Sequence, residues 1–93
     1  MEMYFTPSES AVTDKDLVLA AFTKAGLAPE PELAGSFWIV GFAGSEVFVS
    51  FQERDGGLSF ATLDQPMLSG HDVGHQVFCA LEDMGWIADE DVG

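Results

Sequence analysis

Of all the residues in this sequence that could take part in chemistry, two histidines four residues apart have the spacing that most resembles a functional site. On a helix, His71 and His75 would lie one turn apart on the same face, within reach of one metal ion. Cys79 and Glu82 continue the same stripe and are residue types that bind metals. The chemistry that such a set would support is zinc binding or zinc-dependent hydrolysis.

The residues between the two histidines weaken that interpretation. The run His71-Asp72-Val73-Gly74-His75 resembles the zinc-protease pattern, in which a glutamate follows the first histidine. Here that position holds Asp72, whose shorter side chain reaches less far towards a metal-bound water. We therefore predict no metal and no cofactor, and we interpret the motif as the exposed face of an acidic helix. Metal binding through His71 and His75 is kept as an alternative.

No other group of residues forms a recognisable catalytic set. Glu82 and Asp83 are adjacent, so on a helix their carboxylates would point in different directions. Cys79 has no neighbouring base except His75 that could activate its thiol. Because no nucleophile, base and orienting residue occur together, the sequence predicts a protein that is not an enzyme.

Charge is the most unusual property of the sequence. Sixteen acidic residues against three basic ones give a net charge of −13, whereas a magnitude of about 2–8 suits a small domain for solubility alone. Lys15, Lys24 and Arg54 are the only bases. A field of one sign repels nucleic acid and anionic membranes and attracts basic proteins. We therefore expect a basic protein surface as the partner, with no direct contact to nucleic acid or membrane.

Length and apolar content indicate a single folded domain over residues 1–93, with 1–12 and 88–93 as candidate flexible ends. A single cysteine, Cys79, cannot form an internal disulfide, which favours a reducing compartment. The N-terminus does not read as a signal peptide, and no apolar run approaches the roughly 20 residues that span a bilayer. We expect a cytoplasmic protein, in the host cytoplasm if a phage encodes it.

Two helices are predicted, over residues 14–25 and 70–84. Thr13 with Asp16 forms a capping-box pattern before the first helix, and Ser69 with Asp72 repeats it before the second. Each helix is followed by a glycine, Gly26 or Gly85. The stretch 29–32 contains two prolines and is predicted to be an extended connector.

Three strands are predicted between the helices, at 37–42, 46–52 and 58–63. The turn sequences at 43–45 and 55–57 join them into an antiparallel meander. Residues 3–5 suggest a short edge strand. The order α-β-β-β-α predicts a two-layer α+β fold, with a three-stranded antiparallel meander packed against two helices.

This fold would leave apolar residues on the second face of the sheet. The strand at 37–42 is apolar on both faces, and Phe48 points away from Val47 and Val49. Either the N-terminal segment or Trp86 covers that face, or the face meets another molecule, such as a second copy in a homodimer. Trp38 and Phe48 are the candidate residues for such an apolar interface.

The leading functional hypothesis is a protein that blocks a basic, nucleic-acid-binding surface by imitating a phosphate backbone. The predicted partner-binding carboxylates lie on the second helix and the tail: Asp72, Glu82, Asp83, Asp89, Glu90 and Asp91. In size, charge and lack of a catalytic set, the chain is similar to the small acidic inhibitors that phages use against host nucleases and CRISPR complexes. That likeness implies an inhibitor but assigns a role to no residue.

A second hypothesis is a small acidic dimeric adaptor or secretion-type chaperone. The chain is similar to such chaperones in its acidity and in its order of helix, meander and helix. This resemblance implies that the apolar sheet face, rather than the carboxylates, holds the client protein.

Overall fold

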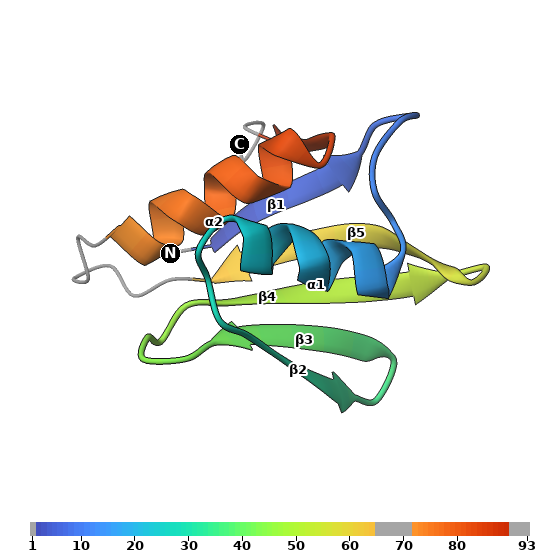
Figure 1. The fold of residues 1–93 in the computed structure, drawn as a ribbon. Coiled ribbons are helices and arrows are strands. Elements are labelled where there is room, and N and C mark those ends of the chain that lie inside the picture. The colour runs from blue at the N-terminus through green and yellow to red at the C-terminus, as the bar shows by residue number, and fades with distance from the viewer. Residues whose placement is uncertain (1, 65–71, 90–93) are drawn as a thin grey trace.

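In the part of the chain that the structure describes, six antiparallel strands form one sheet, and two helices lie on one of its faces (Figure 1). The computed structural model describes residues 2–64 and 72–89. Along the chain, the elements are β1 (Glu2–Pro7), α1 (Lys15–Lys24), β2 (Pro29–Ala34), β3 (Phe37–Phe42), β4 (Phe48–Arg54), β5 (Gly57–Asp64), α2 (Asp72–Asp83) and β6 (Trp86–Asp89). The strands lie side by side in the order β2-β3-β4-β5-β1-β6. The predicted α+β class is confirmed.

The sheet has six strands, where the sequence predicted three. The predicted meander is present as β3, β4 and β5, but β2 extends it on one side and β1 and β6 on the other. β1 is an inner strand between β5 and β6 rather than an edge strand. The predicted connector at 29–32 belongs to β2, five of whose six residues are exposed. Backbone pairing with β3, rather than burial of side chains, holds this strand in place.

Local sequence signals define the helix boundaries closely but not completely. The N-cap of α1 is Asp14 rather than the predicted Thr13, because Asp14 Oδ1 accepts hydrogen bonds from the backbone N–H of Asp16 (2.9 Å) and Leu17 (3.3 Å). The predicted cap of the second helix, Ser69, lies outside the described residues. Neither α1 nor α2 is long and apolar enough to cross a membrane.

The hydrophobic core lies between the helices and the sheet. Phe5 from β1, Phe22 from α1, Phe51 from β4 and Leu81 from α2 are fully buried there. Trp86 belongs to the same core: its ring centroid lies 5.5 Å from that of Phe51, and its Nε1 donates a hydrogen bond to the carbonyl of Val12 (2.9 Å). Trp86 therefore does not cover the second face of the sheet, and β1 joins the sheet instead of folding over it.

The hairpin between β4 and β5 follows the turn signal in the sequence. Asp55 (φ 55°) and Gly56 (φ 83°) both adopt positive φ angles, as a two-residue type I′ turn requires. The predicted Asp-Gly turn is thus confirmed, and it joins the two middle strands of the sheet. The register shifts between Gln52 and Glu53, so that Gln52 pairs with Phe60 while Glu53 pairs with Leu58.

Candidate functional site

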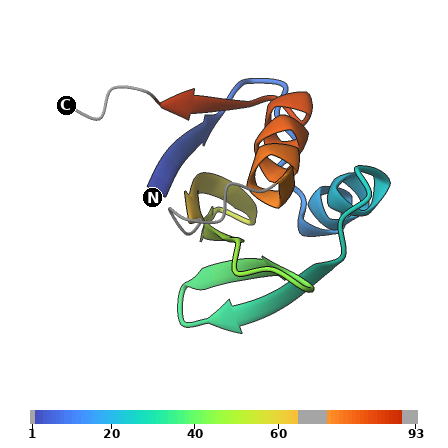
Figure 2. The same ribbon diagram turned by 90° about the vertical axis from the view of Figure 1, so that its left-hand side faces the viewer.

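The sheet face opposite the helices has no helix over it in residues 2–64 and 72–89 (Figure 2). Strand alternation and register place six large apolar side chains on this face: Tyr4, Phe37, Ile39, Phe48, Phe60 and Ile87. We call these six residues the open-face patch. Phe37 (40% exposed) and Ile87 (56% exposed) are its most accessible members, and the other four are half-buried.

Strands that are distant in the sequence form this patch. Tyr4 of β1 pairs with Thr62 of β5, which places the Tyr4 ring beside Phe60, with a centroid distance of 5.9 Å and stacked planes. Phe48 of β4 lies opposite Gly41 of β3. Of the two residues predicted for an apolar interface, Phe48 belongs to the patch. Trp38 does not, since it is only 5% exposed and lies in the helix-side core.

Carboxylates flank the patch on the same face. Register places Glu30 and Glu32 on β2, opposite Gly41 and Ile39 of β3. On the other side, Glu2 of β1 pairs directly with Asp64 of β5. Like charges in directly opposite positions destabilise a sheet, so a cation from outside would be favourable there.

Within the part of the chain that the structure describes, one ion pair is present, between Lys15 Nζ and Glu53 Oε1 at 2.8 Å. The same ammonium lies 5.6 Å from the centroid of the Trp38 ring, on the helix side of the sheet. Lys24 belongs to α1, and Arg54 ends β4 at the hairpin. The open-face carboxylates therefore have no cationic partner among the described side chains.

Only part of the predicted partner-binding set can be located. Glu82 and Asp83 are exposed in the last turn of α2, a turn that contains no basic residue. Asp72 begins α2 and Asp89 ends β6, whereas Glu90 and Asp91 lie outside the described residues. The sequence prediction did not single out the four open-face carboxylates, because only the register between strands shows that they share a face.

The histidine motif is described only in part. His71 lies outside the described residues, and His75 is exposed on α2 with its Nε2 3.6 Å from Cys79 Sγ. Among the residues with described positions, no group of three His, Cys, Asp or Glu side chains could hold a metal ion.

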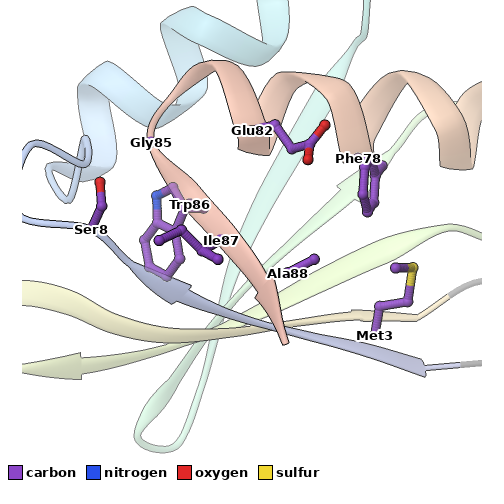
Figure 3. A pocket seen from close by; sticks show the side chains of 8 residues that line it. All are labelled: Met3, Ser8, Phe78, Glu82, Gly85, Trp86, Ile87 and Ala88. Atoms are coloured by element: carbon purple, nitrogen blue, oxygen red, sulfur yellow. The ribbon is translucent and has the colours of Figure 1, made fainter. Parts of the chain in front are cut away.

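A groove of about 570 Å³ lies between α2 and β6 (Figure 3). Its lining residues come from β1, α2, β6 and two connecting segments: Met3, Ser8, Phe78, Glu82, Gly85, Trp86, Ile87 and Ala88. In Figure 3, Glu82 lies nearer to Gly85, and Phe78 lies further along the groove. Sequence reasoning missed this groove because it depends on β6, a strand that was not predicted.

Compared with known proteins, the chain matches no protein-family model, and no curated protein or solved structure shows significant similarity to it.

Proposed function

We propose that the chain is a non-catalytic acidic interaction protein that binds a positively charged surface of a partner protein, of the kind that otherwise holds nucleic acid. The observation that carries this proposal is the open sheet face, where the open-face patch lies beside carboxylates without a described cationic partner. A partner surface with Lys and Arg around an apolar centre would complement both features.

Electrostatics supports a basic partner. A net charge of −13 steers cationic proteins towards the chain and accelerates their encounter. The paired carboxylates of Glu2 and Asp64 repel each other in the free protein. A Lys or Arg side chain placed between them would relieve that repulsion, so binding would weaken as salt screens the charges.

The open-face patch would provide the apolar centre of the contact. Protein interfaces combine a core enriched in aromatic residues with a polar rim. Tyr4, Phe48 and Phe60 have the residue types of such a core, and Glu30 and Glu32 lie at its border on β2. This arrangement supports a contact in which apolar burial gives affinity and the carboxylates select the partner.

In its finer form, the proposal is that the carboxylates replace the phosphates of a nucleic acid in the partner's groove. Glu82 and Asp83 lie on α2, on the other face of the sheet, so they would add to the negative field that attracts the partner rather than to the open-face contact itself, as would Asp72, Asp89, Glu90 and Asp91. The expected consequence is direct competition: the chain displaces a bound oligonucleotide from its partner, and excess oligonucleotide displaces the chain.

The first test is capture of partners from an extract of the native host cells with two matched pairs of variants. Glu30→Lys with Glu32→Lys should abolish capture, whereas Glu9→Lys with Glu46→Lys changes the net charge equally at other exposed sites and should retain most of it. Phe48→Ser should abolish capture, whereas Leu17→Ser, at an exposed leucine of α1 (59% exposed), should not. Thermal melts of each variant separate loss of contact from loss of fold.

Salt dependence distinguishes this proposal from a second candidate. An adaptor or chaperone, or a homodimer, could use the same open-face patch, and the exposure of Phe37 and Ile87 favours that use. Capture by charge should fall steeply between about 0.1 M and about 1 M salt, because the Debye length shrinks from about 10 Å to about 3 Å. The apolar alternative predicts a different pattern. Capture would then persist at high salt and in the Glu30→Lys with Glu32→Lys variant, and would be lost in Phe48→Ser.

A further inference from the structure

We propose that the outer edge of β6 and the groove between β6 and α2 bind an extended peptide segment by strand addition. The segment carries a large apolar residue and a basic residue separated by one position. This site lies at the end of the sheet and on its helix side, and Ile87 is the one residue of the open-face patch that also lines the groove. Because the proposed peptide contacts use the outward backbone of β6 and the side chains of Glu82 and Phe78, the inference goes beyond the proposed function.

The backbone of β6 presents unpaired hydrogen-bonding groups to the outside. The N–H of Ser8 donates to the carbonyl of Gly85 (3.0 Å). By alternation, the backbone N–H and carbonyl groups of Ile87 and Asp89 also point towards β1. The N–H and carbonyl groups of Trp86 and Ala88 therefore point away from β1. Since β6 is the last strand in the order, no strand in the described ranges pairs with these groups (Figure 2).

The opposite edge of the sheet lacks this property. The N–H of Ala43 donates to the carbonyl of Ala28 (3.0 Å), so by alternation the backbone N–H and carbonyl groups of Glu30 and Glu32 point towards β3. Pro29 and Pro31 therefore occupy the positions whose backbone points outward. Proline has no N–H to donate, and edge prolines are a common protection against unwanted strand pairing. Strand addition is thus hindered at β2, whereas β6 contains no proline.

The groove matches the side-chain spacing of an added strand. Residues placed opposite Trp86 and Ala88 would point to the same face as these two residues, which is the face covered by α2. Glu82 and Phe78 lie one helical turn apart on α2, about 6 Å, and alternate residues of a strand lie about 6.8 Å apart. Each of two alternate residues in the segment would therefore meet one of these two side chains (Figure 3).

The lining residues indicate the chemistry of the segment. Glu82 is exposed without a cationic partner among the described side chains, which favours Lys or Arg near the Gly85 end of the groove. Phe78, Met3 and Ala88 line the rest and favour a large apolar side chain. If the segment adds antiparallel to β6, its basic residue lies opposite Trp86 and its apolar residue lies opposite Ala88. The segment therefore has, from its N-terminus to its C-terminus, an apolar residue, any residue and a basic residue.

Charge also disfavours a second copy of this chain as the occupant. Pairing of β6 with β6 of a second copy would bring two strands of sequence Trp86-Ile87-Ala88-Asp89 together, each without a basic residue, beside two copies of Glu82. Like charges across a contact oppose association. A segment of a different, basic protein is therefore the occupant that fits this edge.

The test uses two synthetic peptides, Thr-Thr-Leu-Thr-Arg-Thr-Thr and Thr-Thr-Leu-Thr-Glu-Thr-Thr, both with blocked ends. Amide hydrogen exchange, measured by NMR, should be fast at Trp86 and Ala88 in the free protein. It should become slower when the Arg peptide is added and should not change when the Glu peptide is added. Glu82→Lys should weaken the Arg peptide about fivefold or more and improve binding of the Glu peptide. Asp83→Lys is the matched control, because Asp83 lines a different groove with Lys24 and Ala21.

Several results would overturn the inference. The first is slow amide exchange at Trp86 and Ala88 in the dilute free protein, or protection of these amides that grows with protein concentration. The second is equal affinity for the two peptides. The third is an equal loss of affinity for the Arg peptide in Glu82→Lys and Asp83→Lys. Ala88→Pro removes one outward N–H, as the prolines of β2 do, and should also abolish peptide binding. Glu30→Lys with Glu32→Lys should leave peptide binding intact, so failure here and failure of the proposed function are distinguishable.

Discussion

Individual carboxylates in this protein have different structural roles, which the number of acidic residues alone does not reveal. Asp14 caps α1, and Glu53 pairs with Lys15. Glu2 and Asp64, by contrast, lie directly opposite each other across β1 and β5, where their charges oppose folding. Carboxylates of the second kind are the better candidates for a functional surface, because neither of them forms an ion pair among the described side chains.

The N-cap of α1 gives a prediction at this scale. Asp14→Ala should lower the free energy of unfolding by about 1 kcal/mol, because two backbone N–H groups of the first turn lose their acceptor. Thr13→Ala should have a clearly smaller effect, since its neighbour provides the cap. Urea denaturation of the two variants measures both values. A larger loss in Thr13→Ala would mean that the cap follows the sequence pattern and not the observed geometry.

At the scale of elements, the two strands at the edges of the sheet differ in a way that bears on function. β2 has prolines at two outward-facing positions, whereas β6 presents its backbone to the outside. Edge strands can template the pairing of another chain. The edge at β6 is therefore the one available for strand addition, beside the groove that α2 forms with it.

The ends of the two helices give a prediction at the scale of elements. Gly26 (φ 89°) and Gly85 (φ 90°) have nearly the same backbone conformation, but a Cβ at Gly85 would lie 2.9 Å from Ala11 Cα, and a Cβ at Gly26 would meet nothing within 4 Å. Gly26→Ala should cost about 1–2 kcal/mol from conformation alone. Gly85→Ala should cost at least about 1 kcal/mol more, because the backbone near Ala11 must move.

Urea denaturation curves of both variants measure these costs. The shift at Ala11 would also disturb the hydrogen bonds from Val12 N to Met84 O (2.8 Å) and from Trp86 Nε1 to Val12 O (2.9 Å). Equal costs for Gly26→Ala and Gly85→Ala would show that the segment at Ala11 adapts freely, which would contradict the close packing of Gly85 against Ala11.

At the scale of the whole molecule, net charge opposes the compact state. With one ion pair among the described side chains and a net charge of −13, repulsion between carboxylates is largely uncompensated. A large uncompensated charge therefore has a cost in stability, which a charged partner would reduce by binding.

Salt therefore gives a prediction for the whole molecule. Raising sodium chloride from about 0.02 M to about 0.5 M should raise the melting temperature, because screening weakens repulsion between exposed carboxylates. Calorimetry in a buffer of constant pH measures the change. The control is Glu9→Lys with Glu46→Lys, which lowers the net negative charge and should show a smaller rise with salt. A melting temperature that stays constant or falls with salt would mean that repulsion does not limit stability.

Elements with strong local signals could be predicted from the sequence. The apolar stripes of α1 and α2 have helical periodicity, and Asp55-Gly56 specifies the β4–β5 hairpin. β2 could not be predicted in this way, because five of its six residues are exposed, two of the six are prolines, and its structure depends on pairing with β3. The same reason explains why β6 was missed, since Trp86-Ile87-Ala88-Asp89 is too short to show a pattern.

The sequence by itself determined the α+β class, the central strands, both helices and the excess of negative charge, because periodicity, turn residues and composition are local properties. Only the tertiary structure decided that Trp38 and Trp86 are buried, that Tyr4, Phe48 and Phe60 share an open face with Glu2 and Asp64, and that β6 forms an edge beside Glu82. These features depend on the register between strands that are far apart in the chain. Changing that register by one residue would move each strand's side chains to the other face.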